Sequence, residues 1–93
     1  MAKPSLATHY HLEVYENSLV NDPSFHMDSS TPFASLNVGD YFNHRVADCW
    51  QEPPETGKER FVISEIEHIF WTIEGSHNSQ KLMVVLQKVS REG

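Results

Sequence analysis

The sequence predicts an all-β domain, a small antiparallel barrel or sandwich of about four to six strands joined by long loops. Three observations support this fold class. Apolar and polar residues alternate along Ala7–Glu16, β-branched and aromatic residues dominate Phe61–Ile73, and Lys81–Ser90 is apolar on both faces. The chain has 93 residues, of which 39% are hydrophobic and 22% are charged. That length and composition suit one globular domain over residues 1–93.

The first predicted strand, Ala7–Glu16, has the period of two that is typical of a half-buried strand. Its apolar face consists of Tyr10, Leu12 and Val14. We expect the next segment, Asn17–Pro32, to be a long irregular loop with room for one short turn of helix. Two prolines and a high content of Ser, Asn and Asp favour turns over regular structure in that segment.

Gly39 divides the segment Phe33–Val46 into two extended pieces. Because glycine adopts a positive φ without steric cost, we expect a tight turn or bulge at Val38–Asp40. A strand from Tyr41 to Val46 should follow. The polar segment Cys49–Arg60 contains two prolines and a glycine, which predicts a second loop before the next strand.

The segment ISEIEHIFWTIEG, residues 63–75, fits both a helical and an extended periodicity. Most residues from Phe61 to Ile73 are Val, Ile, Thr, Phe or Trp, and no usual N-cap precedes them. Pleated surfaces favour these residue types, so we interpret the run as a strand. It is long for one straight strand. We therefore expect a bend or bulge near Glu65–His68, which would let its two halves pair with different neighbours.

A turn at Gly75–Ser79 and a last strand at Lys81–Ser90 complete a predicted hairpin. A strand that is apolar on both faces is either central in a covered sheet or part of a subunit contact. Met83 and Val85 on this strand, together with Trp50 beside the second loop, are therefore candidate interaction residues. We expect Trp50 to be the more exposed of the two tryptophans, because it adjoins a loop.

Part of the chain resembles the layout of small SH3-like barrels. The order L-x-V-G-D-Y-F at residues 36–42, a polar loop, F-V-I-S-E-I at residues 61–66 and a closing hairpin carries this resemblance. In such barrels a Gly-Asp turn leads into bent strands. The resemblance covers about half of the chain and implies a layout only, with no activity attached to it.

Charge and cysteine content restrict the partner and the compartment. Thirteen acidic residues against seven basic ones give a formal net charge of −6, which argues against a nucleic-acid partner. No apolar run reaches the length of a membrane span or a signal peptide, so we expect no membrane partner. Cys49 is the single cysteine and has no partner for an internal disulfide. We therefore expect a soluble protein of a reducing compartment, the cytoplasm.

The six histidines of the chain raise the question of a metal site. His9, His11 and Glu13 fall on one face of the first strand, where two imidazoles and a carboxylate could bind zinc or another divalent transition metal. The competing explanation is an ordinary polar strand surface, since a real site needs further ligands and second-shell support. No catalytic or cofactor-binding motif is present, so we assign no catalytic residue and expect no cofactor.

The leading hypothesis is therefore a small non-enzymatic interaction or assembly module that binds a protein partner or a second copy of itself through strand edges. A metal-binding protein or metal-dependent enzyme using His9, His11 and Glu13 is the alternative. A small-molecule pocket between the barrel and the loop Asn17–Pro32 is a third hypothesis.

Overall fold

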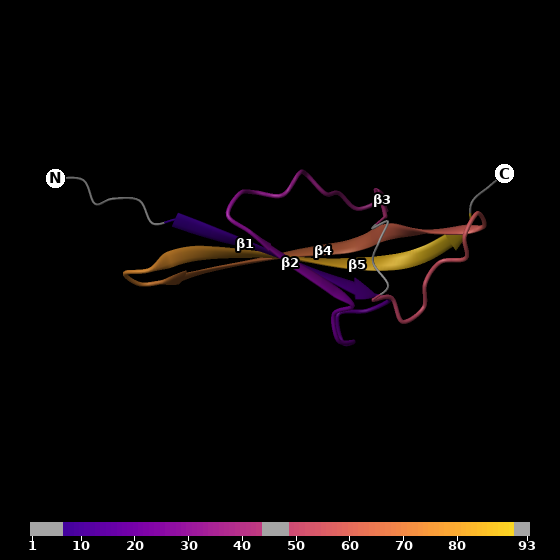
Figure 1. Cartoon of the computed structure of the whole chain (residues 1–93), viewed down its shortest axis with the longest axis horizontal. Helices are drawn as coiled ribbons and strands as arrows, with labels where there is room; N and C mark the ends of the chain where they lie inside the picture. Colours follow the sequence, from indigo (N-terminus) through magenta and orange to yellow (C-terminus); the bar gives the residue numbers. More distant parts are fainter. Residues whose placement is uncertain (1–6, 44–48, 91–93) are drawn as a thin grey trace.

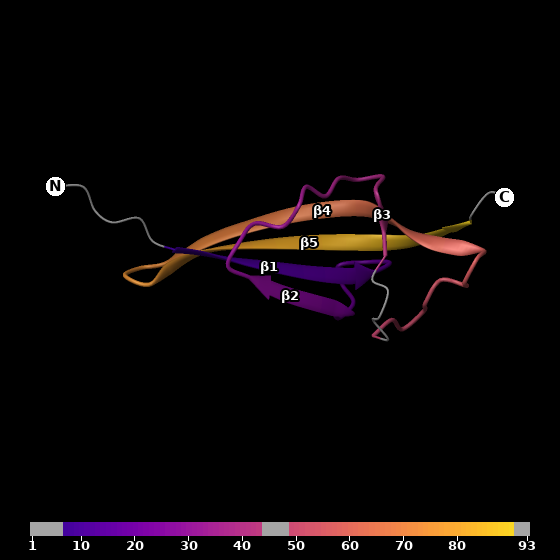
Figure 2. The ribbon, with the colours of Figure 1, turned by 45° about the horizontal axis from the view of Figure 1, so that its top comes forward.

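The computed structural model describes residues 7–43 and 49–90, and its regular elements are all β-strands. The strands are β1 (Ala7–Glu16), β2 (Phe25–Ser29), β3 (Tyr41–Phe42), β4 (Glu59–Ile73) and β5 (His77–Ser90). They form one five-stranded sheet in the order β2-β1-β5-β4-β3 (Figures 1 and 2). The sheet curls into a half-barrel, which confirms the small all-β, barrel-like fold class.

One pairing in this sheet is parallel. β1 and β5 run side by side in the same direction, from Ala7 opposite His77 to Glu16 opposite Leu86, whereas the other three pairs are antiparallel. The sheet is therefore mixed, where the sequence analysis expected antiparallel pairing throughout. Parallel neighbours need a long connection. Here the connection is the chain from β2 to β4, which crosses from one edge of the sheet to the other before β5 returns between them (Figure 2).

β4 confirms that the isoleucine-rich segment is extended. It pairs with β5 from end to end, and the register shifts between Ile63 and Glu65, so that Ser64 is the extra residue of a β-bulge. The bulge lies one residue before the predicted stretch Glu65–His68. Because the extra residue reverses the alternation, Ile66 packs against the same core as Ile63. The bulge therefore explains why neither simple periodicity fitted this segment.

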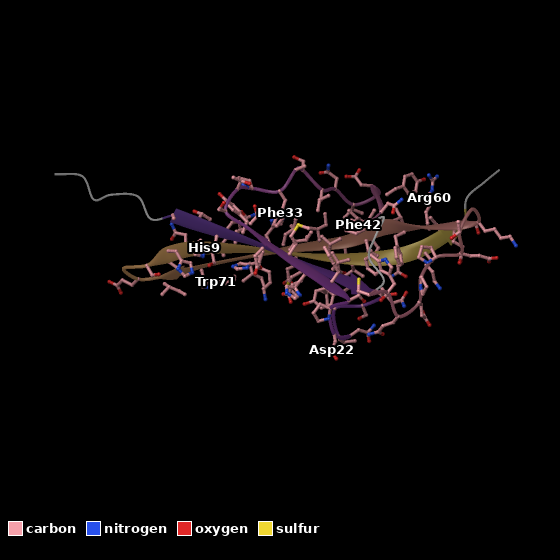
Figure 3. All side chains as sticks on the ribbon, viewed as in Figure 1. His9, Asp22, Phe33, Phe42, Arg60 and Trp71 are labelled. Atoms are coloured by element: carbon pink, nitrogen blue, oxygen red, sulfur yellow. The ribbon has the colours of Figure 1, made fainter. Side chains whose placement is uncertain are left out.

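The core lies on the concave face of the half-barrel. The buried cluster consists of Leu12, Val14, Phe61, Ile63, Leu82, Val84 and Leu86. Loop residues cover one side of this cluster, among them Phe33, Leu36 and Trp50, and Figure 3 shows Phe33 on the same side of the sheet as Phe42. The loops therefore act as the second layer that a single curved sheet needs in order to bury one apolar face.

β2 lies inside the segment that was predicted to be a loop. It pairs with β1 from Val14 opposite Phe25 to Tyr10 opposite Ser29. Asn17, with a φ of 71°, begins the turn between the two strands. A strand of five residues is too short to show a clear periodicity, so its backbone pairing with β1 decides its conformation rather than its own pattern. The prediction of a continuous loop was wrong here.

The turn at Val38–Asp40 is confirmed. Gly39 has a φ of 97°, and its N–H donates a hydrogen bond to the carbonyl of Ile63. The strand that follows is described over Tyr41–Phe42, whereas the prediction ran from Tyr41 to Val46, and residues 44–46 of that prediction lie outside the described residues. Residues 49–58 form the expected loop before β4.

The β4–β5 hairpin is confirmed with a tighter turn than predicted. Gly75 has a φ of 75°, and the N–H of Ser76 donates to the carbonyl of Ile73. The residues His77–Ser79 were predicted in the turn but belong to β5. They are held in the strand because β1 pairs with them on one side and β4 on the other.

Truncating Leu86 tests the position of the core. Leu86 is fully buried, so Leu86→Ala should lower the free energy of unfolding by about 2 to 5 kcal/mol, measured by urea denaturation. The control is Val20→Ala, because Val20 is 91% exposed and its truncation should change stability by less than about 0.5 kcal/mol. Equal effects of the two substitutions would contradict the core described here.

Candidate functional site

β4 forms an open edge of the sheet for most of its length. β3 pairs only with Phe61 and Val62, and Ile63 exchanges backbone hydrogen bonds of 2.8 Å with Gly39 and Asp40. From Ser64 to Ile73, no other strand of the described chain pairs with this edge. Every second residue of an edge strand directs its backbone N–H and C=O away from the sheet. The structure therefore leaves a row of backbone donors and acceptors ready for another strand.

The open edge also carries large exposed apolar side chains. Ile69, Phe70, Trp71 and Ile73 are 39%, 68%, 38% and 47% exposed. Phe70 lies on the concave face beside Tyr10 and Gln80, and Trp71 lies on the opposite face, where its ring stacks on that of His11. Most edge strands are protected by charge, proline or shortness. The open part of β4 has none of these protections along Ile69–Ile73, where large apolar side chains are exposed on both faces of the sheet.

The side chains on the outer face next to this edge are mostly polar, and they form hydrogen bonds and ion pairs with one another. The ring of His11 stacks on Trp71, with centroids 5.7 Å apart, and its Nδ1 lies 2.7 Å from Asp28 Oδ1. This hydrogen bond from His11 is the main reason why the pKa of Asp28 is lowered. Lys81 Nζ lies 2.6 Å from Glu13 Oε1, and that contact raises the pKa of Lys81. Trp71 is thus bordered by charged groups that already have partners.

The candidate metal ligands share a face, as the alternation predicted, but each has a different partner. His9 stacks on His77 with centroids 4.1 Å apart, His11 contacts Asp28, and Glu13 contacts Lys81. Alternate residues of a strand are separated by almost 7 Å along its axis, which is too far for three of them to reach one ion. Within residues 7–43 and 49–90, no group of three or more His, Cys, Asp or Glu is placed to hold a metal.

The three candidate interaction residues lie away from the open edge. Trp50 is half-buried and packs on Phe61, with ring centroids 5.0 Å apart. The expectation that it is the more exposed tryptophan was wrong, because the loop folds back over the core. Val85 is 4% exposed and Met83 is half-buried. Both lie on the central strand, so the two apolar faces of β5 reflect a central position in the sheet.

A buried carboxylate at the end of β1 was not found by sequence reasoning. Glu16 is 5% exposed and accepts hydrogen bonds from the Ser24 hydroxyl and from the backbone N–H groups of Gln51 (2.9 Å) and Glu52 (2.8 Å). Burial acts to raise the pKa of Glu16, but the hydrogen bonds together outweigh it and leave the pKa lowered. Nothing in the local sequence marks Glu16, because its partners come from two distant loops. Its contacts make it an anchor for those loops.

A shallow cavity of about 310 Å³ lies on the concave face under residues 32–37. A pocket against the loop Asn17–Pro32 was expected from the sequence, and this cavity touches only the end of that loop at Pro32. Its lining includes Phe33, Leu36, His68 and Gln80, and the two polar side chains lie 3.4 Å from each other. Small-molecule sites usually place several polar groups around the ligand position. The lining of this cavity mixes polar side chains, among them Tyr10, Ser35 and Asn37, with apolar ones, and it defines no ligand class.

No protein-family model matches the chain, and neither a curated protein nor a solved structure matches it. Within the described residues, no helix has the length and apolar character needed to cross a membrane. The function is therefore argued from the geometry of the sheet edge.

Replacing Glu16 by glutamine tests the anchor and its pH dependence. Glu16→Gln should lower the free energy of unfolding at pH 7 by about 1 to 3 kcal/mol, because the charged acceptor of three hydrogen bonds is lost. In the folded state the pKa of Glu16 lies below its ordinary value of 4.5, so the ionised carboxylate stabilises the fold at every pH above about 4.5. This contribution is lost as the pH falls through the pKa of the folded state.

The stability difference between wild type and Glu16→Gln should therefore shrink as the pH falls below about 4.5, when urea denaturation is followed from neutral to acidic pH. Glu74→Gln in the exposed hairpin turn is the control and should change stability by less than about 0.5 kcal/mol. A difference for Glu16→Gln that is the same at every pH would show that the charge of Glu16 is not the cause.

Zinc should not stabilise the protein. Because His9, His11 and Glu13 have separate partners, adding zinc at a few equivalents should leave the melting temperature unchanged in a thermal-shift measurement. His9→Ala serves as the control for weak surface binding. One tightly bound zinc per chain, with stabilisation that disappears in His9→Ala, would restore the metal hypothesis.

Proposed function

We propose that this protein is a small non-enzymatic assembly module that adds a strand from another polypeptide to the open edge of β4. The single observation that carries this proposal is the coincidence of two features. The backbone edge from Ser64 to Ile73 has no neighbouring strand within the described chain, and the side chains of the same stretch include four large exposed apolar groups. Strand addition uses both features at once.

The edge is suited to an extended peptide. Backbone hydrogen bonds to β4 would supply affinity that does not depend on sequence, and the side chains on the two faces would supply selectivity. On the concave face, Phe70 and Thr72 border a depression shared with Thr8 and Tyr10. On the outer face, Ile69 and Trp71 offer an apolar surface beside Lys81. A partner strand with apolar side chains at alternate positions on both faces would match this pattern.

The other edge of the sheet shows what a protected edge looks like in the same molecule. β2 is only five residues long, and its exposed residues are His26, Met27 and Asp28, so it has one large exposed apolar side chain where β4 has four. Short edge strands with charged side chains resist pairing with other chains. The contrast between β2 and the long apolar edge of β4 supports specific binding at β4 rather than non-specific association through both edges of the sheet.

The polar clusters support binding rather than catalysis. The carboxylates of Glu13, Glu16 and Asp28 each contact a partner within the fold, and these contacts hold neighbouring strands and loops together. We also propose the cytoplasm as the compartment, on the ground that Cys49 is a free and exposed thiol. The SH3-like layout and the exclusion of nucleic acid stay predictions from the sequence, the second supported by the net charge of −6.

A peptide selection tests strand addition directly. The full chain is immobilised at low density, so that copies stay apart, and a random library of peptides of about eight residues is selected against it. We expect enrichment of extended sequences rich in β-branched and aromatic residues, without internal proline.

Ile69→Lys places a charge in the open edge and should abolish this enrichment, whereas Val20→Lys, at a 91% exposed position in the β1–β2 turn, should leave it intact. If every peptide binds wild type and Ile69→Lys equally well, and the protein is also monomeric, the proposed function is wrong.

A further inference from the structure

We infer that the strand received by β4 is β4 of a second copy of this chain, paired antiparallel about a two-fold axis at Phe70. The inference rests on the proposed function and names its partner. It starts from the position of the apolar side chains, which gather in the last part of β4 near the hairpin turn, whereas Glu65 and Glu67 occupy the earlier part. A symmetric pair centred among the apolar residues buries them against one another.

The register follows from the symmetry. When two identical strands pair antiparallel across a two-fold axis, one residue faces its own copy and the others pair at equal distances on either side of it. With Phe70 on the axis, Ile69 faces Trp71 of the partner subunit, and the same contact occurs a second time by symmetry. Ile73 then faces Glu67 of the partner subunit. All four exposed apolar residues of β4 lie in this ladder.

Other registers conflict with charge or with the fold. An axis at Glu67 places this carboxylate opposite its own copy, and an axis at Ile66 places Glu65 opposite Glu67 of the partner subunit. Like charges directly opposite each other destabilise a ladder. An axis at His68 brings the end of the partner's strand opposite Ile63, whose backbone already bonds to Gly39 and Asp40. An axis nearer the turn shortens the ladder. An axis at Ile69 avoids these conflicts, but it places Trp71 opposite Glu67 of the partner subunit and Ile73 opposite Glu65 of the partner subunit. With Phe70 on the axis only Ile73 faces a carboxylate, and Ile69 faces Trp71 of the partner subunit.

The charge of the surroundings also favours this register. Two chains of formal charge −6 repel each other at long range, so the contact must avoid bringing carboxylates together. In the pair centred on Phe70, Glu67 of the partner subunit lies opposite Ile73, and the neighbour of Ile73 on β5 is His77, whose ring stacks on His9. The residue directly opposite this glutamate is therefore apolar, and the next strand beyond it carries an imidazole rather than a carboxylate at that position.

Pairing through β4 produces an assembly that ends at two copies, because each copy uses in the contact the only long open edge of its described residues. Pairing of the two β4 edges joins the two sheets into one continuous sheet, and the contact uses the same surface on both copies. The remaining edges of that sheet belong to the short strands β2 and β3, which are five and two residues long. The assembly therefore stops at two copies rather than growing into a filament.

Sedimentation equilibrium over a concentration series tests the inference. Wild type should dissociate from dimer to monomer on dilution, and Phe70→Lys should raise the dissociation constant by about tenfold or more. Val20→Lys adds the same charge at an exposed position away from β4 and should leave the dissociation constant unchanged. Because Phe70 is exposed in the single chain, both variants should keep the melting temperature that the isolated chain has at high dilution.

A cysteine series tests the register. In a Cys49→Ser background, single cysteines replace His68, Phe70 or Thr72 in turn, and the rate of oxidative cross-linking is compared. Residues directly opposite across a ladder have Cβ atoms about 4.5 to 5.5 Å apart, close to the spacing that a disulfide accepts. Cross-linking should be fastest at Phe70→Cys, because only that residue faces its own copy.

Three results would overturn the inference without touching the proposed function. A chain that is monomeric at every concentration, but that still selects extended peptides, has a different strand as its partner. A dimer that Phe70→Lys and Val20→Lys weaken equally does not use β4. Fastest cross-linking at His68→Cys or Thr72→Cys would overturn the axis at Phe70. A monomer that also selects no peptide would remove the proposed function together with the inference.

Discussion

The structure depends on the double pairing of β5. This strand hydrogen-bonds to β1 on one side and to β4 on the other over most of its length, so its backbone groups are satisfied in both directions. Val84 and Leu86, both fully buried, lie at the centre of the core that these three strands share. Removing either neighbour would expose the strand that has the most buried apolar side chains among the described residues. The rest of the molecule is arranged around this central ribbon.

The same arrangement creates the candidate site. With β5 in the centre, β4 must take an outer position, and the chain supplies only the two-residue β3 and the turn at Gly39 to pair with it. That cover ends at Ile63. The bulge at Ser64 comes directly afterwards and changes which side chains face the core, so Ile66 is packed while the glutamates beside it remain in water. The fold thus separates β4 into a covered part and an open part.

The loops complete the core without closing the barrel. Glu16 holds the segment around Gln51 and Glu52 against the end of β1, and this places the ring of Trp50 on Phe61. The segment with Phe33 and Leu36 covers the neighbouring part of the concave face. The cover at Trp50 lies toward the end of the sheet away from the hairpin turn, the cover at Phe33 reaches His68 and Gln80, and Phe70 beyond them stays exposed. The half-barrel therefore has one end where loop side chains cover the concave face and one end where that face is exposed to solvent.

The sequence by itself determined the local conformations that depend on residue type and spacing. The alternation in Ala7–Glu16, the positive φ at Gly39 and Gly75, and the β-branched content of the isoleucine-rich segment predicted strands and turns close to those observed. These are properties of near neighbours in the chain, and they follow from steric preferences and from the two-residue repeat of a strand.

Only the tertiary structure decided which strands became neighbours. The parallel pairing of β1 with β5, the strand β2 inside an expected loop, and the burial of Trp50 and Val85 all result from contacts between residues far apart in sequence. The candidate edge has the same origin. The apolar residues Ile69–Ile73 are visible in the sequence, but whether a strand is central or at an edge depends on backbone pairing, and backbone groups are the same in every residue except proline.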